Sequence, residues 1–345
     1  MTVVMIEDLD PTSADAGVPA HYGDPMREQR TLATGVGLVD RSNRDVLAVP
    51  GEERASWLHT LTTQHLTALG RNEGTELLVL SPHGHVEHHA LVTEDGTTAW
   101  LDTEPGAGAG LLKYLEMMRF FTRVEPRDAT AEIAVLSLVG PGAAELFGDL
   151  AKPRVGAVPG PKFAAGSVPP AATSHYDVRE YEGGLARRVP LGVDLLVPRA
   201  AKDAVIAKLG VPLAGLWAYE AIRVERHVPR LGWETDHRTI PAEAEFIGPA
   251  VHLDKGCYRG QETVARVHHL GRPPRRLVLL HLDGIATDQP PAKGTPVLAD
   301  GRAVGFVGTA VRHYELGLVA LAVLKRNVPD DADLRVGESA AAVDA

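Results

Sequence analysis

The chain of 345 residues contains only one cysteine, Cys257, so no disulfide can form within it. A lone cysteine fits a reducing compartment, and we expect a cytoplasmic location. The chain also lacks any apolar run near the roughly 18 residues that a membrane-spanning helix needs. The first 25 residues are acidic and rich in Ala, Pro and Asp, unlike a signal peptide. We therefore expect no membrane partner.

Basic charge is not in excess either. The formal net charge is −10 at pH 7, whereas non-specific nucleic-acid binding needs a basic surface. We therefore expect no direct nucleic-acid partner. The chain shows no phosphate-binding loop or dinucleotide fingerprint. Ser42, Ser56 and Ser81 lack the context of a nucleophile elbow.

A weak internal repeat organises the first two thirds of the chain. Val46–Val49 and Val135–Val139 are both apolar runs. Each is soon followed by a glycine, Gly51 or Gly140, and then by a helical pattern. In each half, further strand-like runs and a second helical pattern follow. Each half thus predicts the order β-α-β-β-α, close to a ferredoxin-like split βαβ unit. Two such units packed face to face would leave a cleft between them.

Together with the repeat, the rest of the sequence predicts five segments along the chain. Gly160–Ala172 is rich in Pro, Gly and Ala and predicts a loop, while the alternating runs after Leu277 predict a small antiparallel β-barrel. The fold class is therefore α+β, with two ferredoxin-like units and a C-terminal barrel. The expected segments are a flexible arm (1–25), a first unit (26–130), a second unit (131–274), the barrel (275–335) and a tail (336–345).

The segment around the lone cysteine carries the densest set of reactive side chains. Residues 261–270 predict a helix that Gly271 ends, so Cys257 comes just before its N-terminus. The helix dipole, together with Lys255 and Arg259, would favour the thiolate. Gly256 and Gly260 permit close approach of a ligand to the backbone. A small buried thiol in a plain glycine turn is the alternative, and the residues alone leave both open.

Two carboxylates stand out beyond that segment. Residues 213–226 predict a helix in which Glu225 lies at the end of a largely apolar stripe. A partly buried carboxylate there suits a ligand with two adjacent N–H donors, such as an aminopyrimidinone ring. An ordinary ion pair with Arg223 or Arg226 is the competing interpretation. Glu243, which follows Pro241, is a second candidate of the same kind.

A histidine-rich strand offers a third candidate. His83, His85, Glu87 and His89 alternate along one face of a predicted strand, and His88 faces the other way. Zn²⁺ or Fe²⁺ accepts such ligands, but residues four apart on a strand are about 13 Å apart and cannot share one ion. Polar lining of a cleft and a solvated hairpin remain the alternatives, and we assign no metal ligand.

The segment Lys255-Gly-Cys-Tyr-Arg-Gly-Gln-Glu262 resembles the signature of YgfZ-type folate-binding proteins in the glycine-cleavage T-protein superfamily. Weaker likenesses occur in the right order elsewhere. Arg223-Val-Glu225 resembles the folate-contacting Arg-x-Glu segment of that superfamily, and Ile240-Pro-Ala-Glu243 resembles its Thr-Pro-x-Glu segment. The resemblance covers most of the chain.

The resemblance implies a ring of two ferredoxin-like units and a barrel, with tetrahydrofolate or a one-carbon-substituted form in a central cavity. It also implies a role in iron–sulfur cluster assembly or repair, with iron–sulfur client proteins as transient partners. On this basis the predicted catalytic residues are Cys257 and Lys255, with Cys257 at the cavity rim. The predicted folate-binding residues are Arg223, Glu225, Glu243, Tyr258, Gly260 and Gln261.

One departure bears on the reaction. In the aminomethyltransferases that this chain resembles, a hairpin has the pattern Gly-x-x-Asp-Asp, and its Asp is catalytic. The corresponding hairpin here reads Gly84-His-Val-Glu-His88. This favours a folate-dependent maintenance factor for iron–sulfur proteins. There are two alternatives. One is a folate-dependent aminomethyl- or methyltransferase that uses Glu87 or another carboxylate, and the other is a scaffold that has lost folate.

Overall fold

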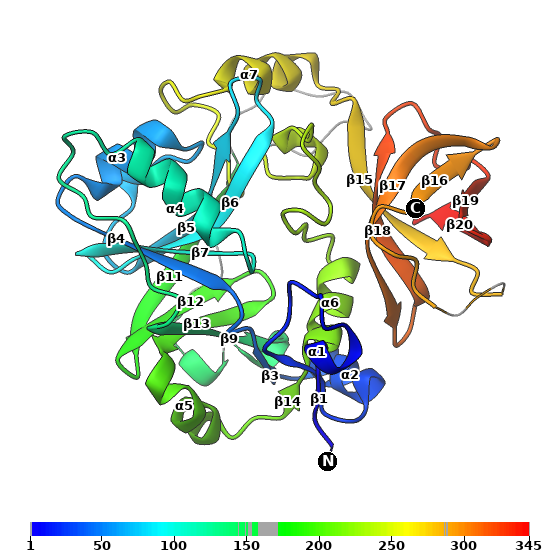
Figure 1. Cartoon of the computed structure of the whole chain (residues 1–345), viewed down its shortest axis with the longest axis horizontal. Helices are drawn as coiled ribbons and strands as arrows, with labels where there is room; N and C mark the ends of the chain where they lie inside the picture. Colours follow the sequence, from blue (N-terminus) through cyan, green and yellow to red (C-terminus); the bar gives the residue numbers. More distant parts are fainter. Residues whose placement is uncertain are drawn as a thin grey trace.

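The computed structural model describes residues 2–143, 145–148, 150, 154–157, 172–285, 287 and 289–344. Two sheet-forming units and a C-terminal barrel are arranged as a ring (Figure 1). The segment 215–274 connects the second unit to the barrel. The predicted α+β class with an antiparallel barrel is confirmed. The loop predicted at Gly160–Ala172 lies, except for its last residue, outside the described residues.

The first unit follows the predicted order of elements. Apolar residues of its strands pack against two helices, because alternate positions such as Leu47 and Val49 point to the same face. Gly51 turns the chain with φ +128°, where a Cβ would lie 2.3 Å from the carbonyl oxygen of Arg123. The elements are β4 (Asp45–Pro50), α3 (Arg54–Leu61), η1 (Leu66–Ala68), β5 (Glu73–Leu80), β6 (Val86–Glu94), β7 (Thr98–Thr103), α4 (Gly108–Met117) and β8 (Arg127–Asp128).

The second unit keeps the strands but not the first helix. Two 3₁₀ turns, η2 (Pro141–Ala143) and η3 (Glu145–Phe147), replace the predicted helix after Gly140. The prediction is wrong here because glycine and proline are the weakest helix formers. The other elements are β9 (Ile133–Val139), β10 (Arg154–Ala157), β11 (Ala172–Tyr181), β12 (Gly184–Val189), β13 (Gly192–Pro198), η4 (Arg199–Ala201) and α5 (Lys202–Leu209).

The two units join edge to edge. β11 pairs with β5 in antiparallel register, Tyr176 opposite Gly74, so both units share one 12-stranded sheet. Their faces also pack against each other, because Val46 of β4 shares an apolar cluster with Val135 of β9 and Leu196 of β13. β3 (Gly37–Asp40), which the predicted boundaries assigned to the first unit, pairs instead with β9 and with β14 (Leu213–Ala214) of the second.

The N-terminal residues are packed rather than loose. β1 (Val4–Met5), α1 (Ile6–Leu9), β2 (Pro19–His21) and α2 (Pro25–Thr34) come first in the chain. Val18 and Ala20 are fully buried, and the carboxylate of Asp15 lies 2.7 Å from the guanidinium of Arg230. The predicted flexible arm is therefore wrong for residues 2–25, because apolar burial and an ion pair hold it.

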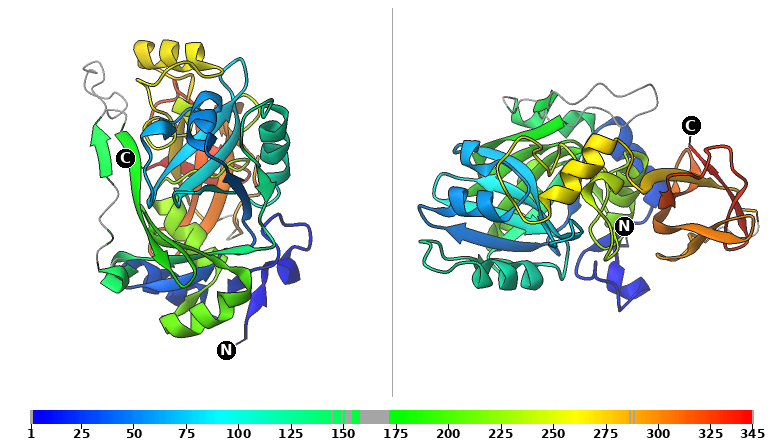
Figure 2. Two further views of the ribbon diagram at one scale, coloured as in Figure 1. Left: turned by 90° about the vertical axis from the view of Figure 1, so that its left-hand side faces the viewer. Right: turned by 90° about the horizontal axis from the view of Figure 1, so that it is seen from above.

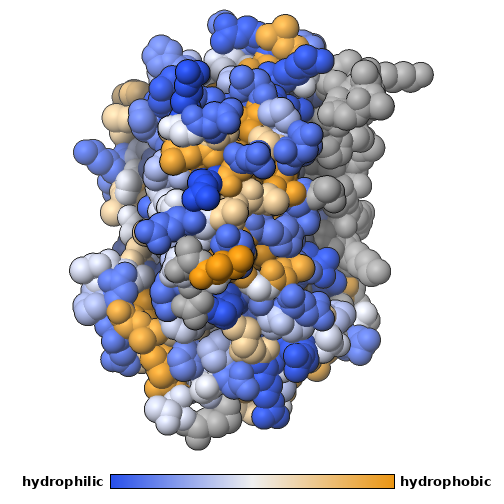
Figure 3. Space-filling view, turned by 90° about the vertical axis from the view of Figure 1, so that its right-hand side faces the viewer, coloured by the Kyte–Doolittle hydropathy of each residue, from blue (hydrophilic) through white to orange (hydrophobic). Residues whose placement is uncertain are grey.

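The barrel closes with strands beyond the predicted boundary. Its first strand, β15, pairs with its last, β20, and the predicted tail is therefore wrong, because β20 completes the barrel. Figure 2 shows the barrel at one end of the molecule, and Figure 3 shows apolar and polar side chains interspersed on that side. The strands are β15 (Arg275–Leu282), β16 (Pro296–Ala299), β17 (Arg302–His313), β18 (Gly317–Lys325), β19 (Leu334–Val336) and β20 (Ser339–Val343).

The segment between the second unit and the barrel contains α6 (Leu216–Glu225), η5 (Pro241–Glu243) and α7 (Gln261–Leu270). α7 has the predicted bounds, and Gly271 ends it in a left-handed conformation at φ +65°. α6 packs against β17 of the barrel, with Val224 buried in a shared apolar cluster. Among the described residues, no helix is long and apolar enough to cross a membrane.

Candidate functional site

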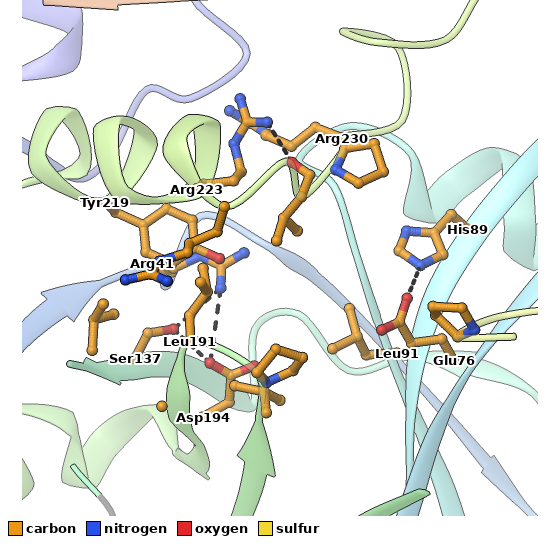
Figure 4. A pocket seen from close by; sticks show the side chains of 18 of the residues that line it. Arg41, Glu76, His89, Leu91, Ser137, Leu191, Asp194, Tyr219, Arg223 and Arg230 are labelled. Carbon is orange, nitrogen blue, oxygen red and sulfur yellow. Dashed lines mark hydrogen bonds and ion pairs between the residues drawn. The ribbon is translucent and has the colours of Figure 1, made fainter. Parts of the chain in front are cut away.

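A cavity of about 250 Å³ lies between the two sheet-forming units and the segment that follows the second unit. Its walls come from β5 and β6, from β9 and β13, from α6, and from the irregular segments 226–230 and 245–249. The aromatic rings of Tyr219 and Phe246 and the apolar side chains of Leu91 and Leu191 contribute to the lining. Figure 4 shows how charged side chains from separate elements converge on this space.

On one side of the cavity, three side chains of the sheet form a hydrogen-bonded group centred on Glu76. His89 Nε2 lies 2.8 Å from Glu76 Oε2, and the hydroxyl of Tyr176 donates to Glu76 Oε1. Although burial acts in the opposite direction, these contacts hold the pKa of Glu76 below its usual value. Glu76 is therefore an ionised carboxylate whose two oxygens both have partners.

Arginines neutralise the other buried acids. Glu104 lies 3.0 Å from Arg44 and 2.7 Å from Arg230. Burial opposes ionisation, but Arg230 and Arg44 still hold the pKa of Glu104 below its usual value. Asp194 accepts from Ser137 at 2.7 Å and pairs with Arg187 at 3.0 Å. Arg187 also pairs with Asp102 of β7 at 2.7 Å, so this buried ion pair joins the two units beside the cavity.

α6 brings one predicted residue into the cavity and turns another away. Arg223 lines the cavity and pairs with Glu220 at 2.6 Å. Glu225 does not line it. The Glu225 carboxylate faces the barrel, where Oε2 lies 3.5 Å from His313 Nε2, and it also lies 3.8 Å from Arg226.

Glu243 has structural partners. Its carboxylate accepts from the backbone N–H of Ile240 at 3.1 Å and pairs with Arg275 of β15 at 2.8 Å. Arg275 also lies 2.7 Å from Asp236. Glu243 is 3% exposed and does not line the cavity. These contacts tie η5 to the first strand of the barrel.

The cysteine segment lies outside the cavity lining as well. The ammonium of Lys255 donates to the backbone carbonyls of Thr62, at 2.6 Å, and His59 at the end of α3. Burial lowers the pKa of Lys255 to about 8. Tyr258 is buried in an apolar cluster with Phe246, and burial raises its pKa to about 12. Cys257 is exposed.

Gly260 and Gln261 begin α7 beside the β5–β6 hairpin. Gly260 has φ +81°, and Gln261 is the first residue of the helix. A Cβ on Gly260 would lie 2.7 Å from the Cα of Gly84 in that hairpin. Of the eight predicted site residues, only Arg223 therefore lines the cavity, and the roles assigned to the others stay predictions.

The histidine strand is interrupted by a β-bulge. Val79 pairs with His88 and Leu80 with Val86, so Glu87 has no partner in the ladder. The predicted alternation is wrong at this point, and His89 faces the cavity while Glu87 pairs with Arg259 at 3.1 Å. Within the described ranges, no group of three or more acidic, histidine or cysteine side chains is arranged to hold a metal ion.

Sequence reasoning missed several lining residues. Glu245 and His227 both line the cavity and both have left-handed backbones, with φ +58° and +55°. No sequence pattern marks them, because the surrounding structure imposes these left-handed backbones. Arg41, whose guanidinium lies 4.2 Å from the ring centroid of Tyr219, was also missed.

Comparisons with known proteins agree with this architecture. The GCVT N-terminal domain matches residues 18–160, and the CAF17 C-terminal beta-barrel domain matches residues 275–345. The chain belongs to the glycine-cleavage T-protein superfamily. Its barrel, of the CAF17 type, makes it a CAF17/YgfZ-type member of that superfamily.

Relatives of this superfamily member cover most of its length. A chloroplastic "putative transferase" of Arabidopsis thaliana is 25% identical over 326 residues, which is 89% of this chain and 70% of the relative. An aminomethyltransferase of Geobacillus kaustophilus is 26% identical, over 90% of this chain and 85% of the relative. The glycine cleavage system aminomethyltransferase T of Bartonella henselae has the same fold, with a TM-score of 0.73, 19% identity and coverage of 97% and 92%.

Proposed function

We propose that this superfamily member binds tetrahydrofolate, or a one-carbon-substituted form of it, in the central cavity. The cavity itself is the observation that carries the proposal. Its volume of about 250 Å³ is close to the lower end of the range typical of small-molecule sites, about 300–1,000 Å³. Flat aromatic faces at Tyr219 and Phe246 and a few charged groups suit a polar heterocycle.

Calorimetric titration with tetrahydrofolate tests this proposal. Leu91 lines the cavity from β6, so Leu91→Trp places an indole where the ligand would bind. The control is Leu316→Trp, because Leu316 is 38% exposed on the barrel. We expect micromolar binding by the wild type and the control, and loss of binding in Leu91→Trp. Absence of binding to the wild type would contradict the proposal and leave a scaffold without folate.

We further propose that the protein supports iron–sulfur cluster assembly or repair, with Cys257 as the residue that meets client proteins. The support is geometric. Lys255 and Tyr258 anchor the segment on both sides of the cysteine, and Cys257 remains exposed. A thiolate nucleophile must be reachable by its target. One cysteine cannot hold a cluster, which usually needs about four ligands, so the thiol would act transiently.

Substitution of the cysteine tests this role. In cells that lack the native protein, we expect Cys257→Ala and Cys257→Ser to leave iron–sulfur tRNA-modifying enzymes with reduced activity, whereas the wild type restores it. Purified Cys257→Ala should still bind tetrahydrofolate, because Cys257 does not line the cavity. Full activity of the client enzymes with Cys257→Ala would contradict the assignment.

Aminomethyl transfer to tetrahydrofolate is the second candidate, and the relatives named aminomethyltransferases favour it. The structure offers it little support, because Glu87 is engaged by Arg259 and does not line the cavity. Formation of methylenetetrahydrofolate from an aminomethyl donor tests this reaction. Such transfer uses no thiol, so activity that survives Cys257→Ala and fails in Glu87→Gln would favour it over the first proposal.

A further inference from the structure

Two consecutive phenylalanines that follow α4 are turned to solvent. Phe121 is 102% exposed and Phe120 is 78% exposed, while Met117 at the end of α4 is 63% exposed. Among the large apolar side chains that the structure describes, Phe121 is the most exposed. Single exposed apolar residues are ordinary on a protein surface, but a group of them marks a contact surface. We call residues 117–121 the aromatic loop.

The backbone on either side of the two rings is held in place by the first unit. The indole N–H of Trp57 donates to the carbonyl of Met118 at 3.1 Å, and Trp57 is 5% exposed. Beyond the rings, Val124 is 1% exposed, and the backbone N–H of Arg123 donates to the carboxylate of Glu53 at 2.7 Å. A surface that is fixed before binding loses little conformational entropy when a partner docks.

Phe120 has a left-handed backbone, at φ +44°. Bulky residues rarely adopt this conformation, and the strain persists only where the neighbouring contacts impose it. Because the ring is exposed, burial of Phe120 within the chain does not account for this strain. Both rings border a groove of about 640 Å³, which Pro50 and Gly51 at the end of β4 also line. Strained, exposed aromatic residues beside a groove indicate a binding surface.

The aromatic loop continues from the helix that contacts the cysteine segment. The Arg259 guanidinium lies 5.8 Å from the ring centroid of Tyr114 in α4, and Arg259 comes two residues after Cys257. From Tyr114 to the end of α4 is less than one helical turn, about 5 Å. A standard interface covers about 800 Å² on each partner. A protein that meets the exposed thiol is therefore large enough to contact the aromatic loop as well.

The charges around the aromatic loop are of both signs. Arg123 lies 3.1 Å from Glu52 and 3.2 Å from Glu53. Arg119 and Glu125, which also line the groove, add one charge of each sign. A partner recognised by its charge would require an excess of one sign on this surface. The phenyl rings rather than the charges therefore determine what fits here, namely a surface with an apolar pocket.

We propose that the aromatic loop is the anchor on which an iron–sulfur client protein docks, so that its target group reaches Cys257. This inference rests on the proposed function, in which Cys257 meets client proteins. The client would offer an apolar pocket to the rings of Phe120 and Phe121, because a few buried aromatic side chains carry most of the binding energy of an interface. The thiol itself contributes little contact area, so a separate anchor is needed to position it.

Binding of a purified iron–sulfur tRNA-modifying enzyme to the full-length protein tests the inference. Phe120→Asn is the most informative variant, because asparagine tolerates the left-handed backbone that strains phenylalanine. We expect its thermal stability to equal or exceed that of the wild type and its binding of tetrahydrofolate to be unchanged. Its affinity for the client enzyme should fall about ten- to one-hundredfold, as at an interface hot spot. Phe121→Ser should show the same loss.

Ile285→Ser is the matched control. Ile285 is 87% exposed in the connection between β15 and β16 of the barrel, so its substitution also removes an exposed apolar side chain. Client affinity within about twofold of the wild type in both phenylalanine variants would overturn the inference, as would an equal loss in Ile285→Ser. Sedimentation tests a second copy of the chain as the occupant. A wild-type dimer that Phe121→Ser converts to a monomer would also overturn the inference.

Assays of client activity in cells separate this inference from the proposed function. If Cys257→Ala leaves the client enzymes fully active, the proposed function fails and this inference fails with it. If Cys257→Ala lowers client activity while Phe120→Asn and Phe121→Ser leave both activity and affinity as in the wild type, only the docking role of the aromatic loop fails. Loss of client activity in all three variants, with tetrahydrofolate binding retained, supports both.

Discussion

Gly260 and Gly84 are in direct backbone contact, so that a Cβ on Gly260 would lie 2.7 Å from the Cα of Gly84. Gly260 belongs to the cysteine segment and Gly84 to the tip of the β5–β6 hairpin. The contact leaves no room for a side chain on either residue. One glycine of the segment therefore serves to place the hairpin against α7.

Because of this contact, Gly260 and Gly256 should differ in how well they tolerate substitution by alanine. Gly260→Ala is strained by φ +81° and by the clash, and we expect it to lower the free energy of unfolding by about 2–3 kcal/mol. Gly256 has no positive φ, and a methyl group on its Cα would have no atom within 4 Å, so Gly256→Ala should change stability by less than about 0.5 kcal/mol. Urea unfolding of both variants measures the difference, and equal values would contradict the packing described.

Lys255 should matter for stability even without any catalytic role. Lys255→Met keeps the aliphatic length but leaves the carbonyls of His59 and Thr62 without their donor. We expect a loss of about 2–3 kcal/mol in the free energy of unfolding. Lys113→Met, on the exposed face of α4, is the control and should lie within about 0.5 kcal/mol of the wild type. Chemical denaturation provides the measurement.

His59 predicts an acid-dependent loss of stability. Burial, followed by the charge of Lys255, lowers its pKa from 6.5 to about 4. Between these values the unfolded chain binds a proton that the folded chain does not, so stability falls as the pH drops. As the pH falls from 6.5 to 4, the free energy of unfolding of the wild type should therefore decrease more than that of His59→Gln. Parallel pH curves for the two proteins would refute this assignment.

Arg230 should be among the most sensitive residues of the chain. It pairs with Asp15 and Glu104 at 2.7 Å each, and its side chain is 7% exposed. Arg230→Met leaves Asp15 buried without a countercharge and leaves Glu104 with Arg44 alone. We expect a cost of about 3–5 kcal/mol. Arg71→Met removes an ion pair with side chains 65% and 69% exposed, and should cost less than about 1 kcal/mol. Thermal and urea unfolding of the two variants provide the comparison.

The sequence predicted local elements better than their assembly. α7 has the predicted bounds, because its apolar positions recur at helical spacing and Gly271 ends it. The edge-to-edge union of β5 with β11 was missed, because pairing between sheet edges leaves no local pattern. The bulge at Glu87 was missed for the same reason, since one extra residue changes which face every later side chain occupies.

The sequence predicted the candidate site less well than it predicted the fold. Arg223 lines the cavity as predicted, but Glu243 is held by Arg275, which lies 32 positions later in the barrel. Glu245 and His227 were missed as lining residues, because the left-handed backbones that bring them to the cavity depend on the tertiary structure. Such backbones leave no trace in the order of the residues.

The pairing of β3 with β9 and β14 has a consequence for how the protein reaches its native state. β3 precedes the whole first unit, yet its neighbours are about 100 and about 175 residues away along the chain. A ribosome-bound nascent chain cannot complete this part of the sheet until Ala214 has emerged. We expect slow, highly cooperative refolding, and fragments cut between the two units should not fold independently.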